Sequence, residues 1–359
     1  MANLSNWGNR LHSGETTYGI VAHRNRFFAV SAALVLFAVV VLVVKGLTLG
    51  IDFKGGSEFI LSDVEGASIT TAVDTVAENY PGEAPVVVPL GASSIRVQLT
   101  TLPQEEIASL AGELAEAYGI PVSKVSSSFI GPTWGEDVSG KAVQGLIVFL
   151  ILVTIVMTVY FRAWRMAVAG LVALLHDLVF TVGIYALSGF EVTPASVIGF
   201  LTILGYSLYD TVVVFDKVKE NTADVLSQHR YTYDELANLA VNQTLVRSIN
   251  TSVVALLPVS AILFIGSFLL GAGTLKDISL ALFVGMAVGT YSSIFVATPL
   301  EVALRDSEPA IKKHTADVLA LRESGGADVV RPDGTVRVGA LVPGHHQGTA
   351  AQPRRKPRK

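Results

Sequence analysis

An aspartate and an arginine lie in stretches of the sequence that are otherwise apolar enough to cross a membrane. Asp210 is followed by five apolar or small residues before the next charge, and Arg247 opens another apolar stretch. A charged side chain in hydrocarbon costs about 3 kcal/mol on insertion scales, so each is a functional candidate. Burial raises the pKa of a carboxyl group and a nearby cation lowers it. A carboxyl that approaches and leaves an arginine is a proton carrier, and we predict that role for Asp210 with Arg247.

Other polar residues accompany this pair. His176 and Asp177 lie at the middle of a third apolar stretch, where they either relay a proton or join helices through a hydrogen bond. Tyr206 lies one helical turn before Asp210. A polar stripe at helical spacing extends from Arg247 and is expected to support it: Gln243, Asn250 and Thr251. The alternative to proton transfer is a static ion pair that only fixes helix packing.

Six apolar stretches must position these residues. Each is long enough to cross about 30 Å of hydrocarbon, which needs roughly 20 helical residues. They cover residues 27–44, 142–161, 166–187, 192–215, 245–268 and 278–300. Only helices and closed barrels satisfy their backbone hydrogen bonds in lipid, and stretches this continuously apolar are helices. The sequence therefore predicts a polytopic α-helical membrane protein with six transmembrane helices.

The composition agrees with a membrane protein and excludes several kinds of site. Hydrophobic residues make up 51% of the 359 residues and charged residues only 16%, whereas soluble proteins have about 25% charged residues. The absence of cysteine excludes disulfides, thiolate metal sites and a cysteine nucleophile. We expect a protein that is not an enzyme and that needs no catalytic residues, cofactor, metal or nucleic-acid partner.

The distribution of lysine and arginine predicts the orientation. Twenty of the 26 basic residues lie in the N-terminal segment, in two of the connections between apolar stretches, at Arg247 and in the C-terminal tail. Because basic connections stay in the cytoplasm, these segments are expected to be cytoplasmic. We therefore predict a multi-pass protein of the cytoplasmic membrane with both termini in the cytoplasm.

Residues 50–141, between the first two apolar stretches, are predicted to form an extracytoplasmic domain. Period-two alternation indicates strands, and apolar residues at i, i+3, i+4 and i+7 indicate helices. The order is strand 57–61, helix 67–80, strand 85–89, strand 94–99, helix 103–118 and strand 122–129. This βαββαβ order is the ferredoxin-like α+β arrangement. That fold hosts many unrelated tasks, so we expect binding or a mechanical role, with catalysis the less favoured alternative.

The remaining segments follow from the same boundaries. Residues 1–26 form a cytoplasmic segment, 27–49 the first transmembrane helix, and 142–306 the other five with a cytoplasmic loop at 216–244. The basic tail 307–359 is expected to be disordered, because 324–359 is rich in Gly, Pro, Arg and Val without periodicity. Its polybasic end is attracted to anionic lipid by about 1 kcal/mol per basic residue; a solvated tail without a partner is the alternative.

Four motifs resemble those of the SecF family of protein-export membrane subunits. The first, GIDFKGGS at 50–57, resembles the signature that opens the family's extracytoplasmic domain. Its signature and hinge residues are Gly50, Asp52, Phe53, Gly55 and Gly56. The other three are ALLHD at 173–177, the segment 204–221, and QTLVRSINT at 243–251. Because all four occur in the family's order and at its membrane depth, the chain is identified as a member of the SecD/SecF family within the RND superfamily.

The resemblance implies a function. Members of the family have six spans and a ferredoxin-like periplasmic domain, pair with SecD, and bind the SecYEG channel. They use the proton-motive force to pull an unfolded exported polypeptide across after SecA has pushed it in. The family's proton-linked carboxylate and arginine map onto Asp210 and Arg247. We therefore expect SecD, SecYEG, indirectly SecA, the exported polypeptide and membrane lipids as partners, and a hinge at 50–56 that moves the domain.

Two other functions remain open. One is an RND-type proton-coupled exporter of a small amphiphile, which needs a pocket in the extracytoplasmic domain and twelve spans reached by homodimerisation. The other is a static assembly factor that stabilises the channel and moves no proton. The second predicts that Asp210→Asn has no effect on export.

Overall fold

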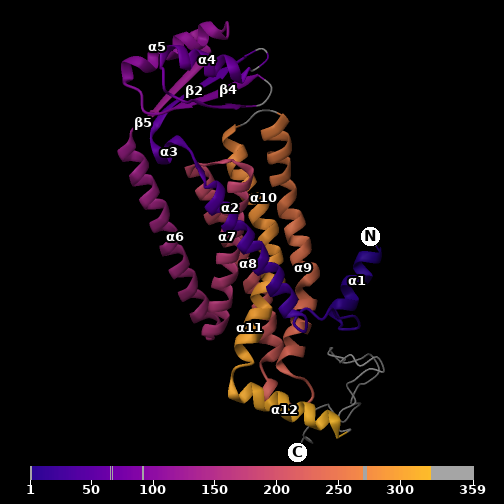
Figure 1. Ribbon diagram of the computed structural model, residues 1–359. Coiled ribbons are helices and arrows are strands. Elements are labelled where there is room, and N and C mark those ends of the chain that lie inside the picture. Colours follow the sequence, from indigo (N-terminus) through magenta and orange to yellow (C-terminus); the bar gives the residue numbers. More distant parts are fainter. Residues whose placement is uncertain (1, 65, 67, 91–92, 270–272, 325–359) are drawn as a thin grey trace, which may run out of the picture. The chain divides into compact units, whose positions relative to one another are not determined.

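The computed structural model describes residues 2–64, 66, 68–90, 93–269 and 273–324 (Figure 1). Contacts divide the chain into two compact units. Unit 1 comprises Met1–Arg24, Val213–Arg247 and Thr298–Lys359, and unit 2 comprises Asn25–Val212 and Ser248–Ala297. The boundaries cut through three long helices, so one helix can contribute residues to both units.

Six helices of the described chain are long and apolar enough to cross a membrane. They are α2 (Arg24–Lys45), α6 (Pro132–Phe161), α7 (Trp164–Ser188), α8 (Pro194–Thr222), α9 (Tyr233–Ala261) continued by the π-helical η3 (Ile262–Leu269), and α10 (Gly273–Ser292) continued by the π-helical η4 (Ser293–Ala297) and α11 (Thr298–Arg305). Each predicted apolar stretch lies on one of these helices, apart from residues 192 and 193, which precede α8, and this confirms the polytopic helical fold class.

Several helices extend beyond the apolar stretches that predicted them. Helix α6 begins at Pro132 and not near residue 142. Helix α8 continues to Thr222 and α9 already begins at Tyr233, so most of 216–244 is helical, with the short η2 (Val225–Ser227) between them. Hydropathy marks only the part of a helix that faces lipid, and a helix can continue into water because its backbone hydrogen bonds are internal.

Residues 56–130 of unit 2 form a small α+β domain, which we call the sheet domain. Its elements are β2 (Gly56–Ser62), α4 (Ile69–Asn79), β3 (Val86–Pro89), β4 (Ser94–Leu99), α5 (Gln104–Ala117), the short η1 (Val122–Lys124) and β5 (Val125–Ile130). The strands are antiparallel in the order β3-β4-β2-β5. The predicted βαββαβ order is thereby confirmed.

The two faces of this sheet have different partners. Helices α4 and α5 cover one face (Figure 1), where the buried core includes Phe59, Leu61, Ile95, Val97 and Leu110. Burying each such side chain contributes about 1.5–3 kcal/mol. Because successive side chains of a strand point to opposite faces, the residues between them in β2 and β4 are available to the other face. Polar and charged side chains occupy it there.

A glycine-rich connection leads from the first span into the sheet domain. Strand β1 (Thr48–Leu49) pairs in parallel with β6 (Glu191–Val192), and the one-turn helix α3 (Ile51–Lys54) follows. Gly55 has φ 77° and Gly56 has φ 147°, values that side chains disfavour. A Cβ on Gly56 would lie 2.5 Å from the carbonyl oxygen of Leu99. Backbone conformation and steric crowding therefore explain why glycine occupies positions 55 and 56, whereas a hinge role for the signature glycines stays a prediction.

Unit 1 is held together by polar contacts among its helices. It contains α1 (Ala2–His12), the adjoining ends of α8 and α9, α11, and α12 (Pro309–Glu323). Arg24 donates to Asp306 at 2.6 Å, and the Tyr233 hydroxyl donates to Glu301 at 2.7 Å. Both terminal nitrogens of Arg322, on α12, donate to the Glu235 carboxylate at 2.7 Å.

Helix α12 corrects the expectation of disorder from residue 307. Pro309 lies in its first turn, Ile311 and Val318 are buried, and His314 lies 2.6 Å from the carbonyl oxygen of Gln228. The composition of 324–359 predicts disorder there but does not extend to residues 309–323, which form this helix. Residues 325–359, including the polybasic end, lie outside the described residues.

Candidate functional site

Asp210 is buried in α8, and each of its carboxylate oxygens accepts a hydrogen bond from a serine. The Ser248 hydroxyl, on α9, donates to Oδ1 at 2.7 Å, and the Ser293 hydroxyl, at the start of η4, donates to Oδ2. The aspartate is only 5% exposed. Because an uncompensated carboxylate in an apolar interior is costly, these two donors allow it to lie there. Asp210 thus joins three helices.

Asp177 is a second buried carboxylate with a matching environment. It lies on α7, is 1% exposed, and accepts hydrogen bonds at Oδ2 from Ser207 at 2.5 Å and from Ser292 at 2.7 Å. The ring nitrogen Nδ1 of the neighbouring His176 lies 3.0 Å from Oδ1. The adjacent residues Ser292 and Ser293 therefore reach two different carboxylates on two different helices.

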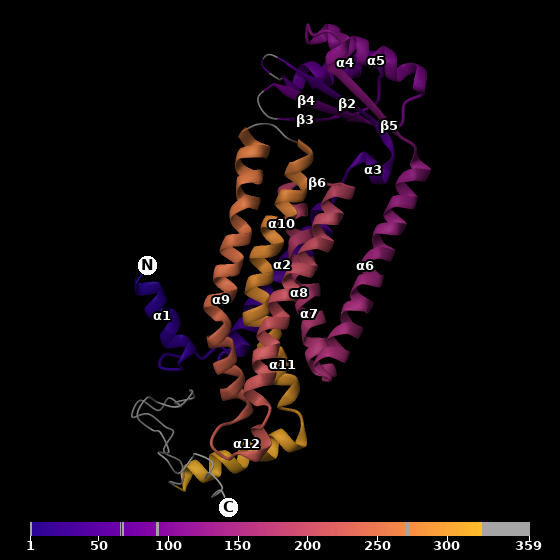
Figure 2. The same cartoon turned by 180° about the vertical axis from the view of Figure 1, so that it is seen from behind.

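Close packing of α8 against α10 brings these groups together (Figure 2). A Cβ on Gly289 would lie 2.8 Å from the Cβ and 3.3 Å from the Cα of Ser207. A Cβ on Gly285 would overlap the side chain of Ile203. Small residues at i and i+4 let helix backbones approach closely in membranes. This approach lets Ser207, on α8, and Ser292, on α10, share the carboxylate of Asp177.

The other predicted site residues are distributed over both units. The Tyr206 hydroxyl donates to Ser252 on α9 at 3.4 Å. Gln243 belongs to unit 1, where it accepts a hydrogen bond from Asn221 at 3.0 Å. Arg247 is exposed and is also a residue of unit 1, whereas Asp210 belongs to unit 2. The Asp210–Arg247 ion pair therefore stays a prediction.

The α9 side chain that donates to Asp210 is Ser248, which lies outside the predicted polar stripe; a supporting role for that stripe stays a prediction. Asn250 is exposed and Thr251 is half-buried, whereas the hydroxyl residues Thr244, Ser248 and Ser252 are buried. These three recur at i, i+4 and i+8, which places them on one helix face. This spacing is present in the sequence, but hydroxyl residues are common in membrane helices and do not by themselves indicate a site.

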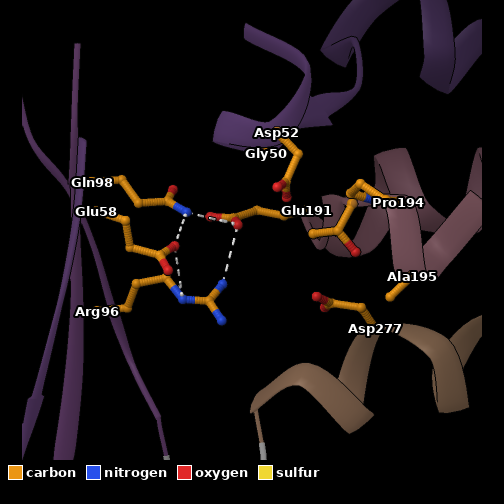
Figure 3. A pocket seen from close by; sticks show the side chains of 10 residues that line it. Gly50, Asp52, Glu58, Arg96, Gln98, Glu191, Pro194, Ala195 and Asp277 are labelled. Atoms are coloured by element: carbon orange, nitrogen blue, oxygen red, sulfur yellow. Dashed lines mark hydrogen bonds and ion pairs between the residues drawn. The ribbon is translucent and has the colours of Figure 1, made fainter. Parts of the chain in front are cut away.

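A second polar cluster connects the uncovered face of the sheet to the start of α8 (Figure 3). The Arg96 guanidinium, on β4, donates to Glu191 at 3.2 Å, and its Nε lies 3.5 Å from Glu58 on β2. The Gln98 amide donates to Glu58 at 2.9 Å and to Glu191 at 3.1 Å. Glu191 lies on β6, between α7 and α8. The sheet domain is therefore tied to the connection between two spans by a buried ion pair.

These residues line a polar cavity of about 260 Å³. Asp52 from the signature segment, Thr193 directly before α8 and Asp277 on α10 are also among the residues that line it. Partial burial and the nearby negative charge of Glu58 raise the pKa of Asp52 above its ordinary value. Within the described residues, no three His, Asp or Glu side chains form a group that could hold a metal ion.

Comparison with known families decides the identity. The family model "Protein export membrane protein SecD/SecF, C-terminal" matches residues 111–307, and the "SecD/SecF GG Motif" model matches residues 40–62. The chain belongs to the SecD/SecF family. The glycine motif match covers the signature at 50–57, so the resemblance stated from the sequence is confirmed, and with its six apolar helices this SecD/SecF family member is embedded in a membrane.

Relatives and solved structures agree with this assignment. The protein translocase subunit SecF of Streptomyces coelicolor is 49% identical over 327 residues, which are 91% of this chain and 87% of that protein. The SecF subunit of Mycobacterium tuberculosis is 44% identical over 339 residues, 90% of this chain and 76% of that protein. The crystal structure of SecDF from Thermus thermophilus, described as a translocon-associated membrane protein, matches with a TM-score of 0.73 and 33% identity. The match covers 82% of this chain and 39% of SecDF.

Proposed function

We propose that this chain is the SecF-type subunit of a protein-export complex and that it uses the proton-motive force, through Asp210, to complete export through the SecYEG channel. One observation carries the proposal: a carboxylate inside a transmembrane helix, 5% exposed, with each oxygen held by a hydroxyl from a different helix. Ionisable residues inside the membrane are expensive and mark ion or proton pathways. Membership of the SecD/SecF family supplies the context.

In this proposal Asp210 takes up a proton from water and later releases it. The ionised carboxylate accepts hydrogen bonds from Ser248 and Ser293 and is attracted to Arg247. The protonated acid is neutral and is itself a donor, so it demands a different arrangement of those hydroxyls. Because the partners lie on different helices, a change in the charge of Asp210 favours a different packing of α8, α9 and the last span.

The driving force sets how much movement one proton can produce. A charge that moves through about 100 mV supplies about 2.3 kcal/mol. That is comparable with the free energy of one or two buried hydrogen bonds that involve charged groups. Several protons are therefore needed for a large movement of the sheet domain, or each proton drives a small step.

We propose that the Arg96–Glu191 pair transmits this movement. Glu191 lies directly before α8, the helix that carries Asp210, and Arg96 lies in the sheet. A displacement of α8 along its axis would pull on the sheet through that pair, while the segment from Gly50 to Gly56 bends. The sheet domain would lie outside the cytoplasm and both termini inside, as the basic residues predict.

The greater length of Thermus SecDF supports a second subunit in the proposed complex. Thermus SecDF contains a region like this chain in 39% of its length. Six spans are half of a pseudo-symmetric transporter. We therefore propose that a SecD-type chain supplies the other half of the helical bundle, and that SecA, the exported polypeptide and membrane lipids act on the assembled complex.

The two alternatives make different demands. An exporter of a small amphiphile needs a site that accepts an apolar body, but the cavity beside the sheet is lined by Asp52, Glu58, Arg96, Glu191 and Asp277. Its charged wall favours the export-subunit proposal. A static assembly factor requires the same fold and family, and differs only in moving no proton.

The test is secretion of a reporter protein by cells whose sole copy carries Asp210→Asn. Asparagine keeps the shape of the side chain but cannot be ionised. The matched control is Asp224→Asn, the same chemical change at an exposed position between α8 and α9. We expect a large loss of secretion for Asp210→Asn only, with normal membrane level and normal association with the SecD-type subunit. Normal secretion in Asp210→Asn would leave the static assembly factor.

A further inference from the structure

Ser292 and Ser293 each have two acceptors for a single hydroxyl hydrogen. Ser292 lies 2.7 Å from the Asp177 carboxylate and 3.2 Å from the carbonyl oxygen of Gly289 in its own helix. Ser293 bonds the Asp210 carboxylate and lies 3.1 Å from the carbonyl oxygen of Thr290. A hydroxyl has one hydrogen to donate and can also accept. Each serine can therefore turn between a carboxylate and its own backbone.

These serines lie at a change of helix type. Helix α10 ends at Ser292 and the π-helical η4 begins at Ser293. Short π-helical segments within α-helices are rare and are frequent at functional sites. A serine that donates to the carbonyl three or four residues earlier also bends a helix. The backbone at this boundary is therefore sensitive to which acceptor each hydroxyl chooses.

We propose that Ser292 and Ser293 are a pair of positioning residues that couples Asp177 to Asp210 through the α10–η4 boundary. The way in which Ser292 holds Asp177 then determines the geometry of Ser293 and hence the proton affinity of Asp210. The inference rests on the proposed function in one respect, namely that Asp210 exchanges protons. It adds that Asp177 tunes this exchange from a different helix, although among the described residues no hydrogen bond joins Asp177 to Asp210.

The exchange of acceptors conserves protons. When Asp210 is ionised, Ser293 donates its hydrogen to Oδ2. When a proton from water binds Asp210, the new O–H of the acid donates to the Ser293 oxygen, and Ser293 turns its own hydrogen to the Thr290 carbonyl. No bond in the serine breaks, and the only proton gained is the one on the carboxyl. The same exchange applies to Ser292, Asp177 and the Gly289 carbonyl.

Other groups around the two carboxylates define the controls. His176 lies beside Asp177 on α7, and Tyr291 packs against the His176 ring with centroids 6.3 Å apart. Ser207, on α8, donates to the same oxygen of Asp177 as Ser292 does, but does not belong to the last span. Removing Ser207 or Ser292 therefore takes the same kind of donor from Asp177. Only Ser292 is adjacent to Ser293.

The experiment measures the titration of Asp210 in the full-length protein in lipid vesicles. Infrared difference spectra report the carbonyl stretch of the protonated acid, and subtraction of the Asp210→Asn spectrum assigns the band. The variants are Ser292→Ala, the matched Ser207→Ala, and Ser260→Ala, whose hydroxyl bonds the Leu256 carbonyl of its own helix. Ser293→Ala and the Ser292→Ala/Ser293→Ala double variant complete a double-mutant cycle.

We expect Ser292→Ala to strengthen proton binding at Asp210 by about twofold to tenfold, the change expected when the hydrogen bond from Ser293 to the carboxylate is weakened but not lost. Ser207→Ala and Ser260→Ala should change it by less than about twofold, and Ser292→Ala should have no further effect once Ser293 is alanine. Equal shifts in Ser207→Ala and Ser292→Ala would mean that Asp177 acts on Asp210 by its charge alone, and would overturn the inference. No shift in either variant would also overturn it.

Two further results keep this test separate from that of the proposed function. If Ser293→Ala does not fold, Ser293→Thr keeps the hydroxyl and should retain the wild-type titration, while Ser292→Ala still carries the test. If Asp210 shows no titration at all, or if Asp210→Asn secretes normally, the proposed function fails. If Asp210 titrates and is required for export but is insensitive to Ser292, only the serine coupling fails.

Discussion

Gly289→Ala should weaken the packing of α8 against α10 although it adds only one methyl group. The new Cβ would lie 2.8 Å from the Cβ of Ser207, 3.1 Å from its Oγ and 3.3 Å from its Cα. Ser207 is 1% exposed and its Oγ is held by Asp177 at 2.5 Å. The side chain cannot simply rotate away, because its hydroxyl would leave the carboxylate, and the Cα belongs to the helix backbone. The two helices must therefore move apart.

The size of the effect follows from two opposing terms. An extra methyl group in a well-packed interior costs about 1–3 kcal/mol. Alanine is favoured over glycine inside a helix by about 1 kcal/mol, which offsets part of this cost. If the separation also breaks the Ser207–Asp177 hydrogen bond, a further 1–3 kcal/mol or so is lost. We expect Gly289→Ala to lower the free energy of unfolding by about 0–2 kcal/mol if that hydrogen bond is kept and by about 1–5 kcal/mol if it is broken.

The matched control is Gly205→Ala in α8, because a Cβ at Gly205 would have no neighbour within 4 Å. Unfolding of the purified protein in mixed micelles, followed by circular dichroism, measures both variants. Gly205→Ala should be as stable as the wild type or slightly more stable. If Gly289→Ala were equally stable, the helices would not pack as closely as described, and the shared hydrogen bonding of Asp177 would be in doubt.

Three more predictions concern the polar clusters. Glu191→Gln should lower the melting temperature, because it removes the charge that Arg96 contacts at 3.2 Å; the expected cost is about 1–3 kcal/mol, and an unchanged melting curve would argue against a transmitting role for the pair. The pKa of Asp52 is raised in the folded protein, so just above the ordinary aspartate range the folded chain keeps a proton that the unfolded chain has lost. The free energy of unfolding should therefore fall as the pH rises through that range, and Asp52→Asn should make this decline smaller. Arg322→Ala removes both hydrogen bonds to Glu235 and should release α12 to limited proteolysis while Lys312→Ala, at an exposed position of the same helix, should not.

The architecture could be predicted from the sequence because it depends mainly on where apolar residues occur and at what spacing. Hydrocarbon requires continuous apolar stretches, and the core of the sheet domain requires alternation in strands such as Ser94–Leu99. Helix ends were less predictable. Tyr233 starts α9 well before the apolar stretch at 245–268, because a helix needs no apolar surface where it lies outside lipid.

The candidate site was only partly predictable. Asp177 and Asp210 could be named because burying a carboxyl in a membrane is costly. Their partners could not, because serine is common and inexpensive to place in a membrane helix, so Ser292 and Ser293 carry no signal until the packing of α8 against α10 is known. Arg96 and Glu191 are 95 positions apart in the sequence, and a local sequence pattern cannot predict a contact over that distance.

The most direct test of proton coupling uses membrane vesicles that hold an exported polypeptide arrested partway through the channel. A proton gradient is then imposed, and the rate at which the arrested chain completes its passage is measured for the wild type, Asp210→Asn and the Asp224→Asn control. We predict that the gradient accelerates completion in the wild type and the control, and has no effect in Asp210→Asn. An equal acceleration in Asp210→Asn would contradict the assignment of Asp210 as the proton carrier.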